Sequence, residues 1–181
     1  MIIEFKSSVV PSSSNTSDAW LFVYSGYRLL VKVSGETASI PTGDETEALG
    51  VTMERSLFLG YYKEHACFAA QATLPDTNQS EASFRELRSL FEVLDTGVYE
   101  IALLGVHLVE WDKNCQFCSK CREPLKQRDD MRAKECAGCG RLEFPRRQLL
   151  AAMAAEFRIV GVISAAVRTS HETSCKVGVE T

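Results

Sequence analysis

Two closely spaced cysteine groups constrain the fold of this chain more than any other feature of its sequence. The stretch CQFCSKC covers residues 115–121, and CAGC follows at residues 136–139. A Cys-x2-Cys step places two sulfurs on one side of a tight turn, and two such steps on facing hairpins close a tetrahedral four-cysteine site for Zn2+. Five of the seven cysteines fall in this window, which a set of unrelated core or redox cysteines explains poorly. The sequence therefore predicts a zinc ribbon.

Three cysteines in the first group leave the ligand register open. Pairing Cys115 with Cys118 leaves 17 residues before Cys136, whereas pairing Cys118 with Cys121 leaves 14. The longer spacing lies inside the usual range for zinc ribbons, and the shorter one lies slightly below it. Spacing alone mildly favours Cys115 and Cys118, and both registers stay open at this point.

The cysteines and the N-terminal sequence together indicate a reducing compartment. A secreted disulfide scaffold needs a signal peptide, and the start MIIEFKSSVVPSSSN has no basic region followed by an apolar one. We therefore expect a cytoplasmic location, with the nucleus as the other candidate. No uncharged apolar run reaches the roughly 18 residues of a membrane span, so we expect no membrane partner.

Charge is distributed unevenly along the chain. The formal net charge is −4, which argues against a generally basic nucleic-acid binder, yet residues 113–147 hold ten Lys or Arg against five Asp or Glu. These basic residues either contact the phosphates of an RNA or a dinucleotide, or balance a four-thiolate zinc site whose net charge is about −2. We favour charge balance.

The N-terminal part of the chain contains strand-like patterns. Apolar and β-branched runs at residues 19–24 and 28–33 flank the turn SGY, and a second strand pair is expected at 56–62 and 66–74. The segment TGDETEALG, which starts at residue 42 between the two pairs, is expected to be a loop.

Two helices are expected after these strands. Apolar residues recur with helical spacing from Phe84 to Leu94, and the segment 95–114 continues as a second helix. The predicted fold class is α+β, with a small antiparallel-sheet N-terminal domain carrying two helices, followed by a zinc ribbon.

The cysteine region also resembles a known protein family. EWDKNCQFCSKCREPL (110–125), followed by CAGCGRLEFPRR (136–147), is similar to the core of the Nudix-family NADH pyrophosphatases, which are also known as NAD(+) diphosphatases and NAD-capped RNA hydrolases. Upstream, SLFLGYYKEHACFAA (56–70) is similar to two strands of the N-terminal Nudix-like domain of that family.

The resemblance implies a domain organisation. Residues 1–112 would form the non-catalytic N-terminal Nudix-like domain, and residues 113–147 would form the zinc ribbon. Residues 148–181 would be a divergent tail that replaces the expected Nudix domain. A homodimer is the partner that the resemblance implies.

The resemblance also implies specific site residues. The zinc ligands that match the family pattern are Cys118, Cys121, Cys136 and Cys139. Cys115 is then the spare cysteine. Arg122 stands where the family usually has glycine. Phe144 matches an aromatic residue that helps to hold the substrate base, and a core aromatic that supports the ribbon is the other interpretation, which stays open. Arg88 matches an Arg near the substrate, and for Arg88 we favour a solvated surface role.

The resemblance stops before the catalytic residues. Family members continue into a Nudix domain whose glutamates hold Mg2+ or Mn2+ against the pyrophosphate of NAD(H) or NAD-capped RNA, and water splits it into AMP and a nicotinamide mononucleotide. After Gln148 only Glu156, Glu172 and Glu180 remain, and no two are adjacent. We therefore assign no catalytic residue and expect a truncated chain that is inactive alone, with Mg2+ or Mn2+ needed only in the full-length parent enzyme.

A second function class fits the same residues. The ribbon could act as a stand-alone module that binds RNA or a protein partner. Steep salt dependence of RNA binding would favour this alternative over a fragment of an enzyme.

Overall fold

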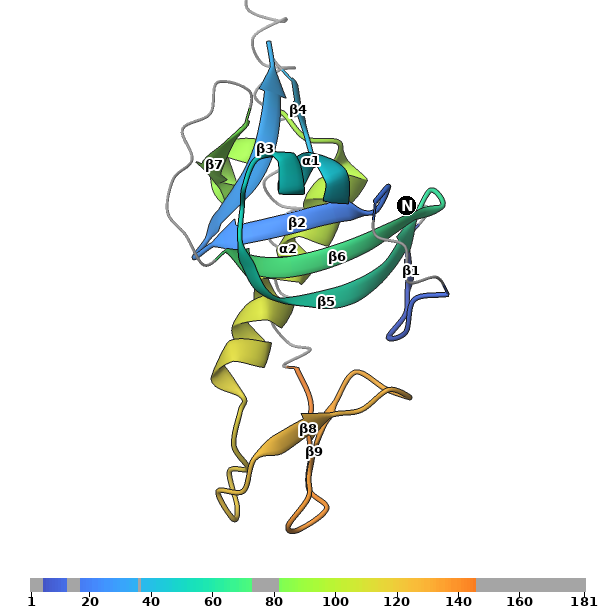
Figure 1. The fold of residues 1–181 in the computed structure, drawn as a ribbon, viewed down its shortest axis with the longest axis vertical. Helices are drawn as coiled ribbons and strands as arrows, with labels where there is room; N and C mark the ends of the chain where they lie inside the picture. Colours follow the sequence, from blue (N-terminus) through green and yellow to red (C-terminus); the bar gives the residue numbers. More distant parts are fainter. Residues whose placement is uncertain (1–4, 13–16, 36, 73–81, 146–181) are drawn as a thin grey trace, which may run out of the picture. The chain divides into compact units, whose positions relative to one another are not determined.

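The computed structural model of the chain describes residues 5–12, 17–35, 37–72 and 82–145 (Figure 1). The chain divides into two units, Met1–Pro145 and Arg146–Thr181. The second unit lies outside the described residues, and so does the predicted tail at 148–181. The predicted domain boundaries therefore stay predictions.

Seven strands of the first unit form one mixed sheet. They are β1 (Phe5–Ser7), β2 (Trp20–Ser25), β3 (Arg28–Ser34), β4 (Thr37–Ser39), β5 (Met53–Tyr62), β6 (His65–Ala72) and β7 (Ala82–Glu86). The order is β1-β5-β6-β2-β3-β4, with β7 also paired to β3 (Figure 1). Both predicted strand pairs, β2 with β3 and β5 with β6, are confirmed as antiparallel hairpins. One neighbouring pair, β2 with β6, is parallel, which makes the sheet mixed.

Two α-helices accompany the sheet, but one of them is not where the sequence placed it. Helix α2 (Thr96–Asn114) confirms the helix expected at 95–114. The prediction of a helix from Phe84 to Leu94 is wrong, because this segment continues β7 and then forms the 3-10 turn η1 (Leu87–Leu90). The other helix, α1 (Gly43–Ala48), lies in a segment that was expected to be a loop. The α+β class holds with these corrections.

Helix α2 packs directly on the sheet. The buried Tyr24 hydroxyl of β2 donates to the backbone carbonyl of Ala102 at 2.7 Å. A Cβ added to Gly105 would lie 2.4 Å from that hydroxyl, so the close approach needs a glycine. The Asp95 side chain caps the start of the helix by accepting from the N–H groups of Gly97 and Val98. The helix is thus fixed at its first turn and along its middle, and its last turn leads into the cysteine region.

The cysteine region forms a second, smaller sheet. Its strands are β8 (Leu125–Gln127), β9 (Lys134–Cys136) and β10 (Leu142–Glu143), in the order β10-β9-β8 and antiparallel throughout. A three-stranded sheet next to four gathered cysteines is the arrangement of a zinc ribbon. We call residues 115–145 the ribbon. Among the described residues, no helix combines the length and apolar character that a bilayer crossing needs.

Substitution of Gly60 by Ala is expected to lower the free energy of unfolding. Gly60 follows a register shift in β5 and has φ 144°, and an added Cβ would lie 2.2 Å from the carbonyl oxygen of Lys6. Backbone strain of this kind costs about 1–3 kcal/mol. Chemical denaturation should show that loss, whereas Glu54→Ala on the exposed part of the same strand should change stability by less than about 0.5 kcal/mol. An unchanged midpoint for Gly60→Ala would contradict the described approach of β1.

Candidate metal centre

The first cysteine pair lies in a tight hairpin loop after α2. Phe117 and Pro124 face each other in an antiparallel bridge. Inside this bridge, the N–H of Cys118 donates to the carbonyl of Glu123 at 2.8 Å, and the N–H of Arg122 donates to the carbonyl of Cys118 at 2.9 Å. We call residues 117–124 the first knuckle. Its backbone hydrogen bonds place Cys118 and Cys121 on one turn.

The second cysteine pair repeats this geometry. The N–H of Gly140 donates to the carbonyl of Cys136, and the N–H of Cys136 donates to the carbonyl of Arg141, both at 2.9 Å. We call residues 136–141 the second knuckle. Gly140, the residue after the second cysteine, has φ 68°, and Arg122 at the equivalent place in the first knuckle has φ 66°. The turn requires a left-handed residue at this place, and glycine meets that requirement without strain.

The four knuckle sulfurs gather into one cluster. All Sγ atoms of Cys118, Cys121, Cys136 and Cys139 lie within 4.8 Å of one another. The Sγ atom of Cys121 is 3.2 Å from that of Cys136 and 3.5 Å from that of Cys139, and the Cys118–Cys139 separation is 3.6 Å. Four sulfurs at about 2.3 Å from a tetrahedral Zn2+ are about 3.8 Å apart. The donor type and the spacing therefore fit Zn2+.

The two thiols of the first knuckle have pKa values shifted in opposite directions. Backbone N–H groups of Cys121 and Lys120 lower the pKa of Cys118 to about 6. The backbone N–H of Glu123 also lowers the pKa of Cys121, but the neighbouring thiols outweigh it and raise the pKa to about 12. One sulfur of the cluster thus ionises easily, and further ionisation is opposed until a cation compensates the charge.

The remaining described cysteines lie outside this cluster. Burial raises the pKa of Cys67 on β6 to about 12, as expected for a core thiol. Cys115 is the C-terminal cap of α2, and its N–H donates to the carbonyl of Trp111 at 2.9 Å. Burial raises the pKa of its thiol as well. The structure therefore gathers the cysteines of the family register, while the register that spacing alone favoured would need Cys115.

A buried lysine joins the ribbon to α2. Lys134 of β9 is only 3% exposed, and its Nζ lies 2.7 Å from Oδ1 of Asp112. The same Nζ donates at 2.8 Å to the backbone carbonyls of Asp112 and Cys115, at the end of α2. It also lies 5.1 Å from the centre of the Trp111 ring. A cation at this place satisfies carbonyls that the helix leaves free and meets the negative end of its dipole.

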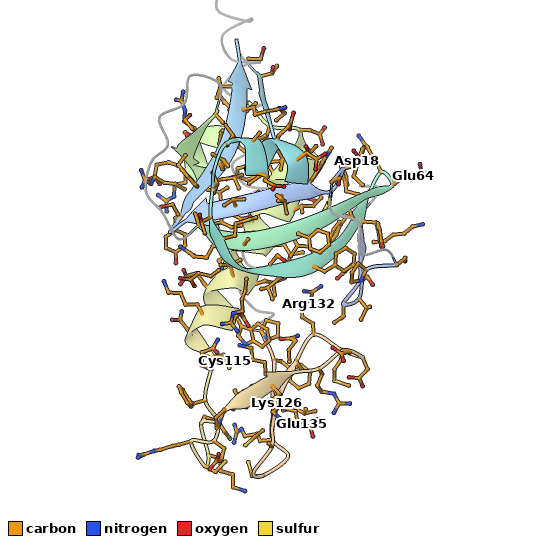
Figure 2. All side chains as sticks on the ribbon, viewed as in Figure 1. Asp18, Glu64, Cys115, Lys126, Arg132 and Glu135 are labelled. Atoms are coloured by element: carbon orange, nitrogen blue, oxygen red, sulfur yellow. The ribbon has the colours of Figure 1, made fainter. Side chains whose placement is uncertain are left out.

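An arginine connects the ribbon to the N-terminal sheet. Arg132, in the loop before β9, extends its guanidinium toward β5 (Figure 2). It donates to the backbone carbonyls of Ser8, Phe58 and Leu59, at 2.6, 3.0 and 3.2 Å. These carbonyls lie at or beside the shift of register in β5 between Phe58 and Gly60. The strand that carries Cys136 is thus tied to both α2 and the sheet.

The two residues predicted near a substrate are exposed. Phe144 follows β10 and is 56% exposed. Arg88 lies in η1, not in the helix that the sequence predicted. No hydrogen bond, ion pair or ring contact among the described residues joins either side chain to the other or to the cysteine cluster. Their role in binding stays a prediction.

Sequence reasoning did not single out Lys134, Asp112 and Arg132 as residues that position the site. Each looks like an ordinary surface charge in the sequence. A Lys two residues before a cysteine of the cluster and an Asp in the last turn of the preceding helix were the available signals, but neither specifies a contact.

A family model and a similar protein both indicate the same family for this chain. A family model for the NADH pyrophosphatase-like rudimentary NUDIX domain matches residues 18–111. The chain is also similar to the NAD-capped RNA hydrolase NudC of Deinococcus radiodurans, with 32% identity over 131 residues. That alignment covers 71% of this chain and 42% of the relative, so the chain spans less than half of the relative's length.

Proposed function

Because the chain belongs to the family of NADH pyrophosphatase-like proteins with a rudimentary NUDIX domain, we propose that it is the non-catalytic N-terminal and zinc-ribbon portion of a NAD(H) pyrophosphatase. The parent activity would be metal-dependent hydrolysis of NAD(H) or NAD-capped RNA, with AMP on one side and nicotinamide mononucleotide on the other. In this proposal the chain is truncated, and Mg2+ or Mn2+ acts only in the parent enzyme. The activity of the relative belongs to a protein of which this chain covers less than half.

One observation carries the proposal, namely the attachment of the cysteine cluster to the N-terminal sheet. Lys134 and Arg132 anchor β9 on α2 and β5, and β9 ends at Cys136. This attachment of the ribbon to α2 and the sheet suits a scaffold that must hold a following domain in a fixed position. The proposed metal is a structural Zn2+ on Cys118, Cys121, Cys136 and Cys139. It would lock both knuckles and thereby fix the exit of the chain at Phe144 and Pro145.

The proposal includes partners and location. A homodimer and a cytoplasmic site, with the nucleus as the other candidate, follow from the family resemblance and from reduced cysteines. Size-exclusion chromatography with light scattering would measure the oligomeric state, and a monomer over the accessible concentration range would remove the dimer from the proposal.

The purified chain is expected to release no AMP from NADH above background with Mg2+ or Mn2+. The reason is that the sequence after Gln148 offers no paired glutamates for a catalytic metal. Chromatography of the nucleotide products would measure this directly. The matched test is the triple variant Glu156→Gln, Glu172→Gln, Glu180→Gln. AMP release by the wild-type chain that this variant abolishes would overturn the non-catalytic assignment.

The second candidate function is a stand-alone ribbon module that binds RNA. It is favoured by three exposed cations without an ionic partner among the described residues: Lys120, Arg122 and Lys126. Two other ribbon arginines, Arg128 and Arg141, are paired with carboxylates. RNA binding with a steep salt dependence, in a chain without hydrolase activity, would support this module.

A further inference from the structure

We propose that the first knuckle is a contact site for single-stranded RNA, with Phe117 as a stacking platform for a base and Lys120 and Arg122 as phosphate contacts. This inference rests on the RNA-directed part of the proposed function and names the residues that would touch the RNA chain.

The first argument is the exposure of an aromatic ring at the mouth of a closed loop. Phe117 is 66% exposed, although its neighbour Cys118 is only 2% exposed. Pairing with Pro124 fixes the backbone on both sides of the ring. An exposed ring on a rigid loop offers a face for stacking at little entropic cost, and base stacking on such rings is tolerant of sequence.

The second argument is charge. The first knuckle carries the cations Lys120 and Arg122 and one carboxylate, Glu123. Both cations are exposed, and neither has an ion pair with a described residue. The Cγ atom of Glu123 lies 2.9 Å from where a Cβ on Gly138 would be, so the stem of this acid lies against the second knuckle. A loop that carries an exposed ring and two cations without an ion pair to a described residue matches the alternation of bases and phosphates in a single strand.

The third argument is the backbone of Arg122. The equivalent residue of the second knuckle is Gly140, and their φ angles of 66° and 68° both lie in the left-handed region. Arginine at this place is strained where glycine is not. A strained residue whose exposed head group has no ion pair with a described residue is explained most simply by a function of that head group.

Charge balance of the metal site is the competing explanation. Four thiolates around Zn2+ leave a net charge of about −2, and nearby cations could compensate it. Lys120 does contact a sulfur of the cluster, but through its backbone: its N–H nitrogen lies 3.4 Å from Sγ of Cys118. No side-chain hydrogen bond from Lys120 or Arg122 to a cysteine sulfur is present among the described residues. The two explanations differ in what Arg122→Gly should change.

The test is binding of the full, zinc-loaded chain to a fluorescently labelled, uncapped single-stranded RNA, followed by anisotropy over a salt series. We expect Phe117→Ala to weaken binding roughly 5- to 100-fold. Arg122→Gly and Lys120→Gln should each reduce the slope of log K against log salt by about 1. Lys6→Gln, an exposed cation on β1, removes the same charge outside the ribbon and should leave both quantities unchanged.

Zinc content and thermal midpoint are measured on the same variants. Arg122→Gly should retain its zinc and melt no lower than the wild type, because the glycine relieves strain. Wild-type affinity in both Phe117→Ala and Arg122→Gly, or no RNA binding by the wild type, would overturn the site. Affinity lost only in proportion to zinc loss would establish charge balance instead, and equal affinity for duplex RNA would refute stacking. The AMP assay is independent of all these results, so failure here leaves the proposed function to its own test.

Discussion

Cys136→Ser is expected to abolish stoichiometric zinc binding and to unfold the ribbon. Cys136 is 1% exposed, and its sulfur lies 3.2 Å from that of Cys121. Structural Zn2+ contributes about 10–16 kcal/mol to the folding of finger-sized peptides. Three short strands cannot bury enough apolar surface to replace that contribution. Metal analysis should therefore find about one Zn2+ per wild-type chain and close to none in the variant.

Cys115→Ser is the matched control, because Cys115 lies outside the cluster and this variant should keep its metal. A spectroscopic readout follows from Lys134, whose Nζ lies 5.1 Å from the Trp111 ring. In a Trp20→Phe background the remaining tryptophan, Trp111, reports on this joint alone, and its emission should shift when a chelator removes the metal. Zinc retained by Cys136→Ser, or lost by Cys115→Ser, would refute the ligand assignment.

The hairpins and the cysteine cluster were predictable because their signals are local. Gly26, with φ 63°, supports the turn between β2 and β3, and the strands on each side are apolar in the sequence. The cysteine steps likewise specify tight turns by themselves. Only the register needed more than spacing, since CQFCSKC permits two knuckles and the family resemblance selected the one that the structure gathers.

Helix α1 shows a local signal that could have been used. Thr42 accepts from the N–H of Glu45, and the Glu45 side chain accepts from the N–H of Thr42. This reciprocal pair is a capping box, and its Thr-x-x-Glu pattern is visible in the sequence TGDE. The polar, glycine-containing composition of the segment led to the expectation of a loop. Composition was thus a poorer guide than the cap.

The segment from Phe84 to Leu94 shows the opposite error. Its apolar residues follow helical spacing, yet Ala82–Glu86 pairs with β3 along five positions. The 3-10 turn that follows buries Leu87 and Leu90, which are three residues apart, and so imitates a helical face. Glu86 makes no side-chain cap at the start of that turn. Pairing with β3, which lies far earlier in the sequence, makes Ala82–Glu86 a strand. A local sequence pattern carries no information about such pairing.

The joint between ribbon and sheet could not be predicted for a related reason. Arg132 reaches carbonyls of β5 that precede it by more than 70 residues, at a shift of register in that strand. Lys134 belongs to a strand of alternating charge, in which it reads as a solvated residue. Lys134 is buried because it packs against the last turn of α2, where it contacts Trp111 and the carbonyls of Asp112 and Cys115. This packing exists only in the folded chain.

Lys134→Met is expected to lower the free energy of unfolding by about 3–5 kcal/mol, the usual result of removing one partner from a buried ion pair. Asp112, whose side chain is 11% exposed, would lose its nearest cation and keep only Arg55 at 3.2 Å. The carbonyl of Cys115 would also lose the Lys134 donor at the end of α2, and the carbonyl of Asp112 would keep the side-chain amide of Gln116 as a donor. Methionine fills similar space, so the loss measures charge and hydrogen bonding more than a cavity.

Chemical denaturation of the zinc-loaded chain would measure this loss, with metal content checked in parallel. Lys126→Met on the exposed face of β8 removes the same charge from the ribbon and should change stability by less than about 0.5 kcal/mol. The double variant Lys134→Met, Asp112→Leu should be less destabilised than the sum of its single variants, because it leaves no unpaired buried carboxylate. Strict additivity, or a loss below about 1 kcal/mol for Lys134→Met, would mean that the ribbon and α2 are not held together by this pair.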